Sequence, residues 1–358
     1  MTGERSFAIG GRQVGRGHPP LIIAEMSGNH NQAFDRAIAI VEVAARAGAH
    51  AVKLQTYTAD TMTLDLRQGE FVLADPDSPW RGQSLYELYQ KAYTPWEWHE
   101  PIFRRCRELG LIGFSTPFDA SAVDYLESLG VPCYKIASFE IVDLALIRRV
   151  AATGKPLILS TGMATESEIE EGVAAARGAG CRDLMLLKCT SSYPAVPADS
   201  HLAAIPHMRE RFDCVVGLSD HTLGIGAAVA SIALGAAAIE KHVTLARADG
   251  GVDAAFSLEP GELAQLVAET RRAWEAMGAV RYGPSEHEKA SLVFRRSLYV
   301  VRDMKAGDMF SPENLRAIRP GHGLPPKHLP ALLGKAVRRD VAKGTPVSWE
   351  LLTDRDTG

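Results

Sequence analysis

VVGLSDHT at residues 215–222 and AAIEKHVT at residues 237–244 share one pattern: a short apolar run passes directly into polar, ionisable residues. Such runs are typical of buried parallel strands, and the carboxyl ends of these strands carry the functional groups of βα barrels. His221 and His242 close two strands that follow each other along the chain. We therefore expect both imidazoles at one barrel mouth, close enough to reach a single ion.

The same alternation of short apolar runs and amphipathic helical stretches covers most of the chain. The predicted strands are residues 21–24, 51–54, 111–114, 133–136, 157–159, 184–187, 215–218 and 236–239. Gly48, Gly110 and Gly235 each stand where a helix would stop before the next strand. A doubly wound sheet would carry a glycine-rich loop after its first strand, whereas residues 25–31, EMSGNHN, have one glycine. The sequence predicts an α/β fold, a (β/α)8 TIM barrel.

Other segments lie outside this repeat. We assign residues 1–282 to the barrel domain, with residues 1–20 as a hairpin over its floor, and residues 283–295 to a linker. Residues 296–358 predict a small, mainly-β domain with glycine- and proline-marked turns. Its thin core would gain by docking on the barrel or on a partner chain.

One βα connection is unusually long. Residues 57–96 mix aromatic and polar side chains, which favours a lid or substrate-binding loop over a surface ornament.

Composition narrows the class of protein. The 358 residues are 46% hydrophobic and 23% charged, with a net charge of −4, so a nucleic-acid partner is not expected. No run approaches the roughly 18 to 20 apolar residues of a membrane span. The five cysteines are scattered without a CxxC pair, which favours reduced thiols in the cytoplasm.

The histidine pair predicts a metal site. Imidazole nitrogens bind divalent cations, and a bound cation polarises a carbonyl as a Lewis acid. His221 follows Asp220 and His242 follows Lys241, and these charged neighbours strengthen the metal interpretation over that of two ordinary core histidines. With so few protein ligands, substrate and water would complete the shell, and several metals would be tolerated.

Two lysines at strand ends predict an anion site. Lys53 has Gln55 and a threonine nearby, and Lys135 is followed by Ser138. Hydroxyls also close two further strands, at Thr116 and Ser160. Lysines, hydroxyls and backbone amides together suit a phosphate. The alternatives are a structural lysine that reaches the rim and a Schiff-base lysine.

Three carboxylates complete the set. Glu25 and Glu140 end strands without a cation nearby in sequence, so either can act as acid or base or orient a substrate hydroxyl. Asp253 follows the last strand at a distance that suits a loop over the mouth, although a helix cap is an equal alternative.

Ordered motifs along the chain resemble the sialic acid synthase (NeuB-like) family, which joins phosphoenolpyruvate to an amino-sugar aldehyde. They are IAEMSGNHN, VKLQTYTADTMTL, FSTPFD, YKIASFE, LSTGMAT, KCTSSYP, GLSDHT and EKHVT. The segment from residue 297, SLYVVRDMKAGDMFSPENLRAIRPGHGL, resembles the antifreeze-like (SAF) domain of these enzymes. TYTADTMTL, SLYELYQKAYTPWEWH, KCTSSYP and GGVDAAFSLEP look like the pseudaminic acid synthase branch.

The resemblance implies roles by position. The metal, Mn²⁺, Mg²⁺ or Co²⁺, would be bound by His221 and His242. Phosphoenolpyruvate would be contacted by Lys53, Thr116, Lys135, Ser138, Ser160, Ser191 and Ser219. The sugar would face Glu25, Glu140, Tyr193 and Asp253. Arg319 would reach the barrel of a second subunit, which implies a domain-swapped homodimer.

Alternatives to this interpretation remain. The same chemistry could serve an N-acetylneuraminate or legionaminic acid synthase. A lysine-based aldolase would use Lys135, and a carbohydrate-binding protein would use the C-terminal domain alone.

Overall fold

The computed structural model describes residues 5–74 and 80–353. The chain divides into two compact units, Met1–Gly278 and Ala279–Gly358. Each unit has a hydrophobic core of its own.

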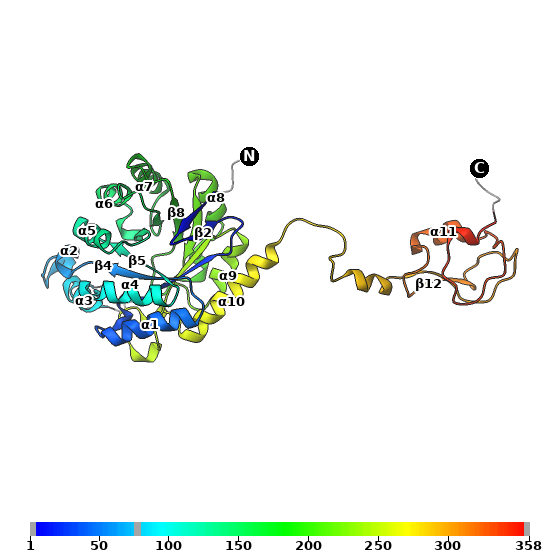
Figure 1. Cartoon of the computed structure of the whole chain (residues 1–358), viewed down its shortest axis with the longest axis horizontal. Helices are drawn as coiled ribbons and strands as arrows, with labels where there is room; N and C mark the ends of the chain where they lie inside the picture. Colours follow the sequence, from blue (N-terminus) through cyan, green and yellow to red (C-terminus); the bar gives the residue numbers. More distant parts are fainter. Residues whose placement is uncertain (1–4, 75–79, 354–358) are drawn as a thin grey trace. The chain divides into compact units, whose positions relative to one another are not determined.

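Parallel strands of the first unit close into a barrel (Figure 1). In chain order they are β3 (Leu21–Glu25), β4 (Ala51–Thr56), β5 (Ile112–Pro117), β6 (Tyr134–Ile136), β7 (Leu157–Ser160), β8 (Leu184–Cys189), β9 (Val215–Ser219) and β10 (Ala238–His242). Neighbours in the chain are neighbours in the sheet, and β10 pairs with both β9 and β3. The predicted (β/α)8 barrel is confirmed, with a strand at each predicted position.

Helices surround the barrel, and each packs one apolar stripe against the strands (Figure 1). They are α1 (Phe34–Arg46), α4 (His99–Glu108), α5 (Ala120–Ser128), α6 (Leu144–Ala151), α7 (Glu166–Gly178), α8 (Ala204–Phe212), α9 (Gly226–Ala233) and α10 (Pro260–Met277). In α1 the buried positions include Ala37, Ile40, Val41 and Ala44, the spacing of one helical face. Gly48 follows this helix with φ of +82°, a conformation that favours glycine and ends the helix.

A hairpin covers the amino-terminal end of the barrel. Its strands are β1 (Ser6–Ile9) and β2 (Arg12–Gly15), which pair antiparallel. Ile9 and Val14 are fully buried, and they belong to the apolar cluster that fills the barrel interior. This end of the barrel is therefore closed by packed side chains, and the chemistry is left to the other end.

The long connection after β4 contains structure of its own. It includes α2 (Ala59–Met62) and α3 (Leu85–Ala92), and α3 begins with a capping box between Ser84 and Glu87. Part of this connection, residues 75–79, lies outside the described residues. Its role as a lid stays a prediction.

The second unit is small and mainly β. Its β11 (Ser297–Val300) and β12 (Leu315–Ile318) pair antiparallel, isolated bridges connect its loops, and α11 (Leu329–Leu332) packs on its core. Within the described residues of the whole chain, none of the helices combines the length and the apolar character that a membrane-spanning helix requires.

Candidate active site

Strand alternation determines which side chains enter the barrel mouth. On β10, Ala238 packs inside the barrel and Ile239 packs outside against the helices. Because every second residue of a strand shares a face, Glu240 and His242 point inward, whereas Lys241 points outward. The same rule turns inward the polar residues that end the other strands: Glu25, Lys53, Gln55, Thr116, Lys135, Ser160, Cys189 and Ser219.

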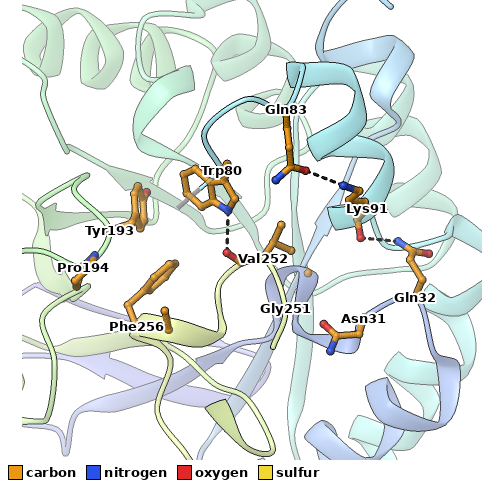
Figure 2. A pocket seen from close by; sticks show the side chains of 12 residues that line it. Asn31, Gln32, Trp80, Gln83, Lys91, Tyr193, Pro194, Gly251, Val252 and Phe256 are labelled. Atoms are coloured by element: carbon orange, nitrogen blue, oxygen red, sulfur yellow. Dashed lines mark hydrogen bonds between the residues drawn. The ribbon is translucent and has the colours of Figure 1, made fainter. Parts of the chain in front are cut away.

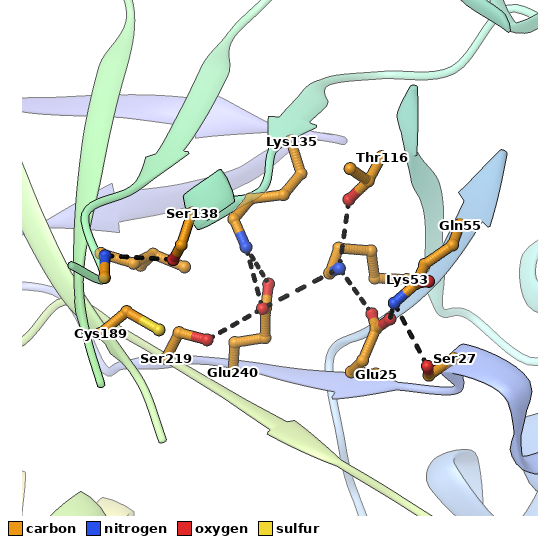
Figure 3. Close-up of polar contacts among 12 residues, drawn as sticks. Glu25, Ser27, Lys53, Gln55, Thr116, Lys135, Ser138, Cys189, Ser219 and Glu240 are labelled. Atoms are coloured by element: carbon orange, nitrogen blue, oxygen red, sulfur yellow. Dashed lines mark hydrogen bonds and ion pairs between the residues drawn. The ribbon is translucent and has the colours of Figure 1, made fainter. Parts of the chain in front are cut away.

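Two lysines and two glutamates form a buried ion cluster in this mouth (Figure 3). Lys135 Nζ donates to both carboxylate oxygens of Glu240, at 2.9 and 3.1 Å. Lys53 Nζ lies 2.7 Å from Glu25 Oε2 and 3.9 Å from Glu240 Oε1. It also donates to Thr116 Oγ1 at 3.2 Å.

The cluster changes the acidity of its members. Burial opposes ionisation of Glu240, but the attraction of Lys135 and Lys53 outweighs it and brings the pKa of Glu240 down to about 2. Burial raises the pKa of Glu25, and Lys53 offsets this only in part. When Glu25 holds a proton, the ammonium groups of Lys53 and Lys135 face a single carboxylate, that of Glu240. One positive charge is then left unbalanced, and a bound anion can neutralise it.

Hydroxyl groups gather beside the lysines. Ser219 Oγ donates to Glu240 Oε1 at 3.1 Å, and Ser138 Oγ accepts the Gly162 amide at 3.1 Å. A Cβ on Gly162 would lie 2.1 Å from Ser191 Oγ, so this glycine lets Ser191 and Ser138 approach the same point. Ser160 Oγ is buried and has no hydrogen-bond partner in the described chain. The structure thus brings the predicted phosphate-binding hydroxyls and lysines together.

The two histidines are adjacent, with ring centroids 5.3 Å apart. His221 Nδ1 lies 2.9 Å from the Thr190 carbonyl oxygen. If this nitrogen carries the proton, Nε2 keeps its lone pair for a ligand. Burial and the neighbouring His221 hold the pKa of His242 well below its usual value, so this ring is neutral. His242 Nδ1 is buried without a hydrogen-bond partner among the described residues.

These features fit a divalent cation bound by two imidazoles. Across residues 5–74 and 80–353, no group of three His, Cys, Asp or Glu side chains is arranged to hold a metal by itself. The pair therefore suits a cation that takes its other ligands from substrate and water, as the sequence predicted.

Beside the lysines and histidines, the mouth carries further hydrogen-bonding groups that suit a sugar. Gln55 Nε2 donates to Glu25 Oε1 at 2.9 Å and to Ser27 Oγ at 3.2 Å, and Ser27 donates to Asp253. Asp253 Oδ2 lies 3.8 Å from His242 Nδ1. The Asp253 side chain makes no helix-capping hydrogen bond, so the capping alternative is wrong.

Tyr193 and Glu140 complete the predicted set within this unit. The Tyr193 ring lies 4.5 Å from that of His221. Glu140 follows β6, and its Oε2 is buried without a hydrogen-bond partner in the described structure. Burial raises the pKa of Glu140 to about 7, which suits proton transfer near neutral pH. Arg319 belongs to the second unit and is exposed there, so its role stays a prediction.

Sequence reasoning misjudged two charged residues and missed others. Asp220 and Lys241 do not support the histidines: they pair with each other at 2.7 Å behind the strands. Glu240 was overlooked because it ends an apolar run, although its two-residue spacing from His242 gives it the same face. Ser27 and Cys189 were also missed, and Cys189 Sγ lies 3.9 Å from His221 Nδ1.

With this geometry in place, comparison with known proteins assigns the family. Residues 40–282 match the NeuB family, and residues 295–353 match the SAF domain. The chain belongs to the NeuB family. The predicted resemblance is thereby confirmed.

Relatives of known activity cover almost the whole chain. Pseudaminic acid synthase of Helicobacter pylori is 41% identical over 92% of this chain and 97% of its own length. That of Campylobacter jejuni serotype O:2 is 41% identical over 90% of this chain and 94% of its own length. A solved structure, the N-acetylneuraminic acid synthetase of Leptospira borgpetersenii with citrate, has a TM-score of 0.72 and 31% identity, covering 81% of this chain and 95% of its own. These relatives are sugar acid synthases, which places the chain in the transferase class.

Proposed function

We propose that this chain is a pseudaminic acid synthase. It would condense phosphoenolpyruvate with 2,4-diacetamido-2,4,6-trideoxy-L-altrose and water to give pseudaminic acid and phosphate. The observation that carries this proposal is a single mouth with lysines and hydroxyls, a histidine pair and a hydrogen-bonded chain of polar side chains, in a chain 41% identical to two pseudaminic acid synthases. Legionaminic acid synthases are more distant, at 35% identity for that of C. jejuni.

The lysine side would bind phosphoenolpyruvate. Lys53 and Lys135 would exchange part of their contact with Glu25 and Glu240 for the phosphate, and the raised pKa of Glu25 eases that exchange. Ser138, Ser160 and Ser191 would donate to the phosphate oxygens. Such preorganised donors stabilise charge that grows on a departing phosphate.

The reaction joins two carbons and releases phosphate by C–O cleavage. A divalent cation at His221 and His242, Mn²⁺, Mg²⁺ or Co²⁺, would make the aldehyde carbon more electrophilic. Carbon 3 of phosphoenolpyruvate attacks that carbon, and water adds at carbon 2. Glu140, with a pKa of about 7, would take the proton from this water.

The hydrogen-bonded side chains beside the lysines and histidines would orient the sugar. Glu25, Gln55 and Asp253 form one hydrogen-bonded chain through Ser27, so they would hold the hydroxyl or acetamido groups in a fixed position. Tyr193 would cover the sugar from the side of His221.

We also propose a homodimer in which Arg319 of one subunit completes the mouth of the other. Support comes from large apolar side chains that are 56% to 62% exposed in the βα connections: Leu64, Phe139, Val142, Met163, Val196 and Leu223. Connections of this kind lie on the catalytic face of a barrel. An apolar rim there favours a covering partner.

We expect the enzyme to act in the cytoplasm. The cysteines are all free and buried, which fits a reducing compartment.

A sugar panel tests the proposal. The purified protein is incubated with phosphoenolpyruvate, Mn²⁺ and either the diacetamido sugar, its legionaminic acid counterpart or N-acetylmannosamine, and phosphate release is measured. The highest kcat/KM is expected for the diacetamido-L-altrose. A clear preference for another sugar would make the chain a legionaminic or neuraminic acid synthase.

A lysine aldolase remains the second candidate, because burial lowers the pKa of Lys135, as a Schiff-base lysine requires. The two hydrogen bonds to Glu240 weigh against it, since they stabilise the ammonium form. Borohydride reduction with pyruvate would label Lys135 in an aldolase and should leave this protein unmodified.

A further inference from the structure

A cavity of about 540 Å³ opens beside the candidate active site. It lies between the segment after β3, the long connection after β4, the segment after β8 and the loop after β10 (Figure 2). None of the groups assigned above to phosphate or metal binding lines it; the only shared residue is Tyr193.

One wall of this cavity is aromatic. The ring centroids of Trp80 and Tyr193 lie 6.2 Å apart, and those of Tyr193 and Phe256 lie 5.1 Å apart. Trp80 Nε1 donates to the Val252 carbonyl at 2.9 Å, which fixes the indole against the loop after β10 (Figure 2). This wall suits a methyl group or another small apolar group.

The other wall carries amides and one ammonium group. Lys91 Nζ donates to Gln83 Oε1 at 2.8 Å, and this leaves the Gln83 amide nitrogen to face the cavity (Figure 2). A Cβ on Gly251 would lie 2.5 Å from Asn31 Oδ1, so only a glycine here keeps that oxygen accessible. None of the described residues that line the cavity is acidic.

The aromatic wall also fixes how far the cavity lies from the reacting carbon. The Phe256 ring lies 5.0 Å from that of His242, and the Tyr193 ring lies 4.5 Å from that of His221. The cavity begins beyond these two rings. Carbon 4 of the open-chain sugar is three bonds from the aldehyde carbon, whereas carbon 2 is one bond from it. With the aldehyde carbon at the histidines, a substituent on carbon 4 of the sugar reaches past the rings, whereas one on carbon 2 stays beside them.

We propose that this cavity binds the acetamido group on carbon 4 of the sugar and thereby selects diacetamido sugars over those with a hydroxyl there. The inference rests on the proposed function and names the residues that set its specificity. The acetamido methyl packs against Trp80, its carbonyl accepts from Gln83, and its N–H donates to Asn31 Oδ1. A hydroxyl would leave these amides and the aromatic wall without partners, which is how polar sites reject an incomplete substrate.

The test compares two sugars that differ only at carbon 4: the diacetamido-L-altrose and its analogue with a hydroxyl there. For Trp80→Ala we expect kcat/KM to fall about 30-fold with the diacetamido sugar and by less than about threefold with the analogue. For Gln83→Ala we expect kcat/KM to fall about tenfold with the diacetamido sugar and to stay unchanged with the analogue. If the analogue turns over too slowly, its competitive inhibition constant replaces kcat/KM.

Two further variants separate selectivity from structure. Trp80→Phe loses the bond to Val252 but keeps an aromatic wall, and should retain most of the selectivity. Tyr86→Phe alters a half-buried residue of α3 whose hydroxyl donates to Asp60 and which does not line the cavity, so it should match the wild type. An equal loss on both sugars, or an unchanged ratio in both alanine variants, would overturn the inference while the proposed function stands. A wild-type protein that does not convert the diacetamido sugar would overturn the proposed function itself.

Discussion

The barrel holds two buried sets of lysine–carboxylate ion pairs, which use the same residue types in different surroundings. Behind the strands, Lys241 Nζ contacts Asp220 Oδ2 at 2.7 Å and also donates to the Thr222 carbonyl, while Asp220 Oδ1 accepts the Thr222 amide. Both charges of this outer pair are satisfied by each other and by the backbone of Thr222. It has nothing left to offer a ligand.

In the mouth, Lys53, Lys135, Glu25 and Glu240 are surrounded by polar atoms that lack partners. Among the described residues, Glu140 Oε2, Ser160 Oγ and His242 Nδ1 are buried in this mouth without a hydrogen-bond partner. Unsatisfied groups of this kind are rare in folded proteins and call for an explanation. The outer pair therefore fits a role in stability, whereas the inner cluster fits the proposed binding of a substrate.

The largest expected effect comes from the histidines of the mouth. Either His221→Ala or His242→Ala should lower turnover at least about 1,000-fold, because the group that activates the aldehyde is no longer held. Circular dichroism should show an unchanged fold. His207→Ala, on the outer helix α8, is the matched control and should keep full activity. Full activity of a chelated, metal-free protein would refute the metal role.

Substitution of one lysine from each set tests the difference between the inner cluster and the outer pair directly. Lys135→Met should reduce kcat/KM for phosphoenolpyruvate about 100- to 1,000-fold, since a phosphate ligand is lost. Lys241→Met should instead lower the free energy of unfolding by about 3–5 kcal/mol, because Asp220 remains as an unpaired buried charge. The folded fraction of that variant should keep its activity. Equal effects of the two substitutions on kcat/KM would remove the distinction between the sets.

The raised pKa of Glu140 predicts that both turnover and stability depend on pH. If it accepts a proton from water, turnover should fall as the pH drops below its pKa of about 7. Glu140→Gln should lower kcat about 100-fold and abolish this inflection. Because the folded-state pKa is raised above the unfolded value, the group stabilises the fold at low pH, and this stability is lost as the pH rises through about 7. Denaturant unfolding at pH 5 and pH 8 should therefore show a smaller loss for Glu140→Gln than for the wild type.

Arg319 is expected to have the smallest effect. Arg319→Ala should lower turnover about tenfold through the loss of one charged hydrogen bond. Light scattering should show the proposed dimer in both the variant and the wild type. An unaltered rate would mean that the second unit contributes nothing to the mouth.

The fold and many of the residues of the candidate site could be predicted from the sequence alone. The apolar runs predict the position of each strand, and the polar residues at the strand ends predict the lysines, serines and histidines of the mouth. Glu240 escaped because an apolar run hides it, and only the barrel register shows that it faces Lys135. The bond between Ser27 and Asp253 joins residues 226 positions apart, so no local pattern could predict it.

The cavity at Trp80 was beyond sequence reasoning for a related reason. Its walls come from four separate connections of the barrel, and the motifs in these connections do not show that their side chains meet around one cavity. The length and the mixed aromatic and polar composition of the segment after β4 predict a lid or a substrate-binding loop. Which of its side chains face the site depends on tertiary packing.

The most direct test of the account follows the bridging oxygen of phosphoenolpyruvate. The enzyme is incubated with phosphoenolpyruvate labelled with ¹⁸O between carbon 2 and phosphorus, together with Mn²⁺ and the diacetamido-L-altrose, and both products are analysed by mass spectrometry. The account predicts labelled phosphate and an unlabelled sugar acid, because the C–O bond breaks and water supplies the oxygen on carbon 2. Label retained in the sugar acid, or no phosphate release with this sugar, would contradict it.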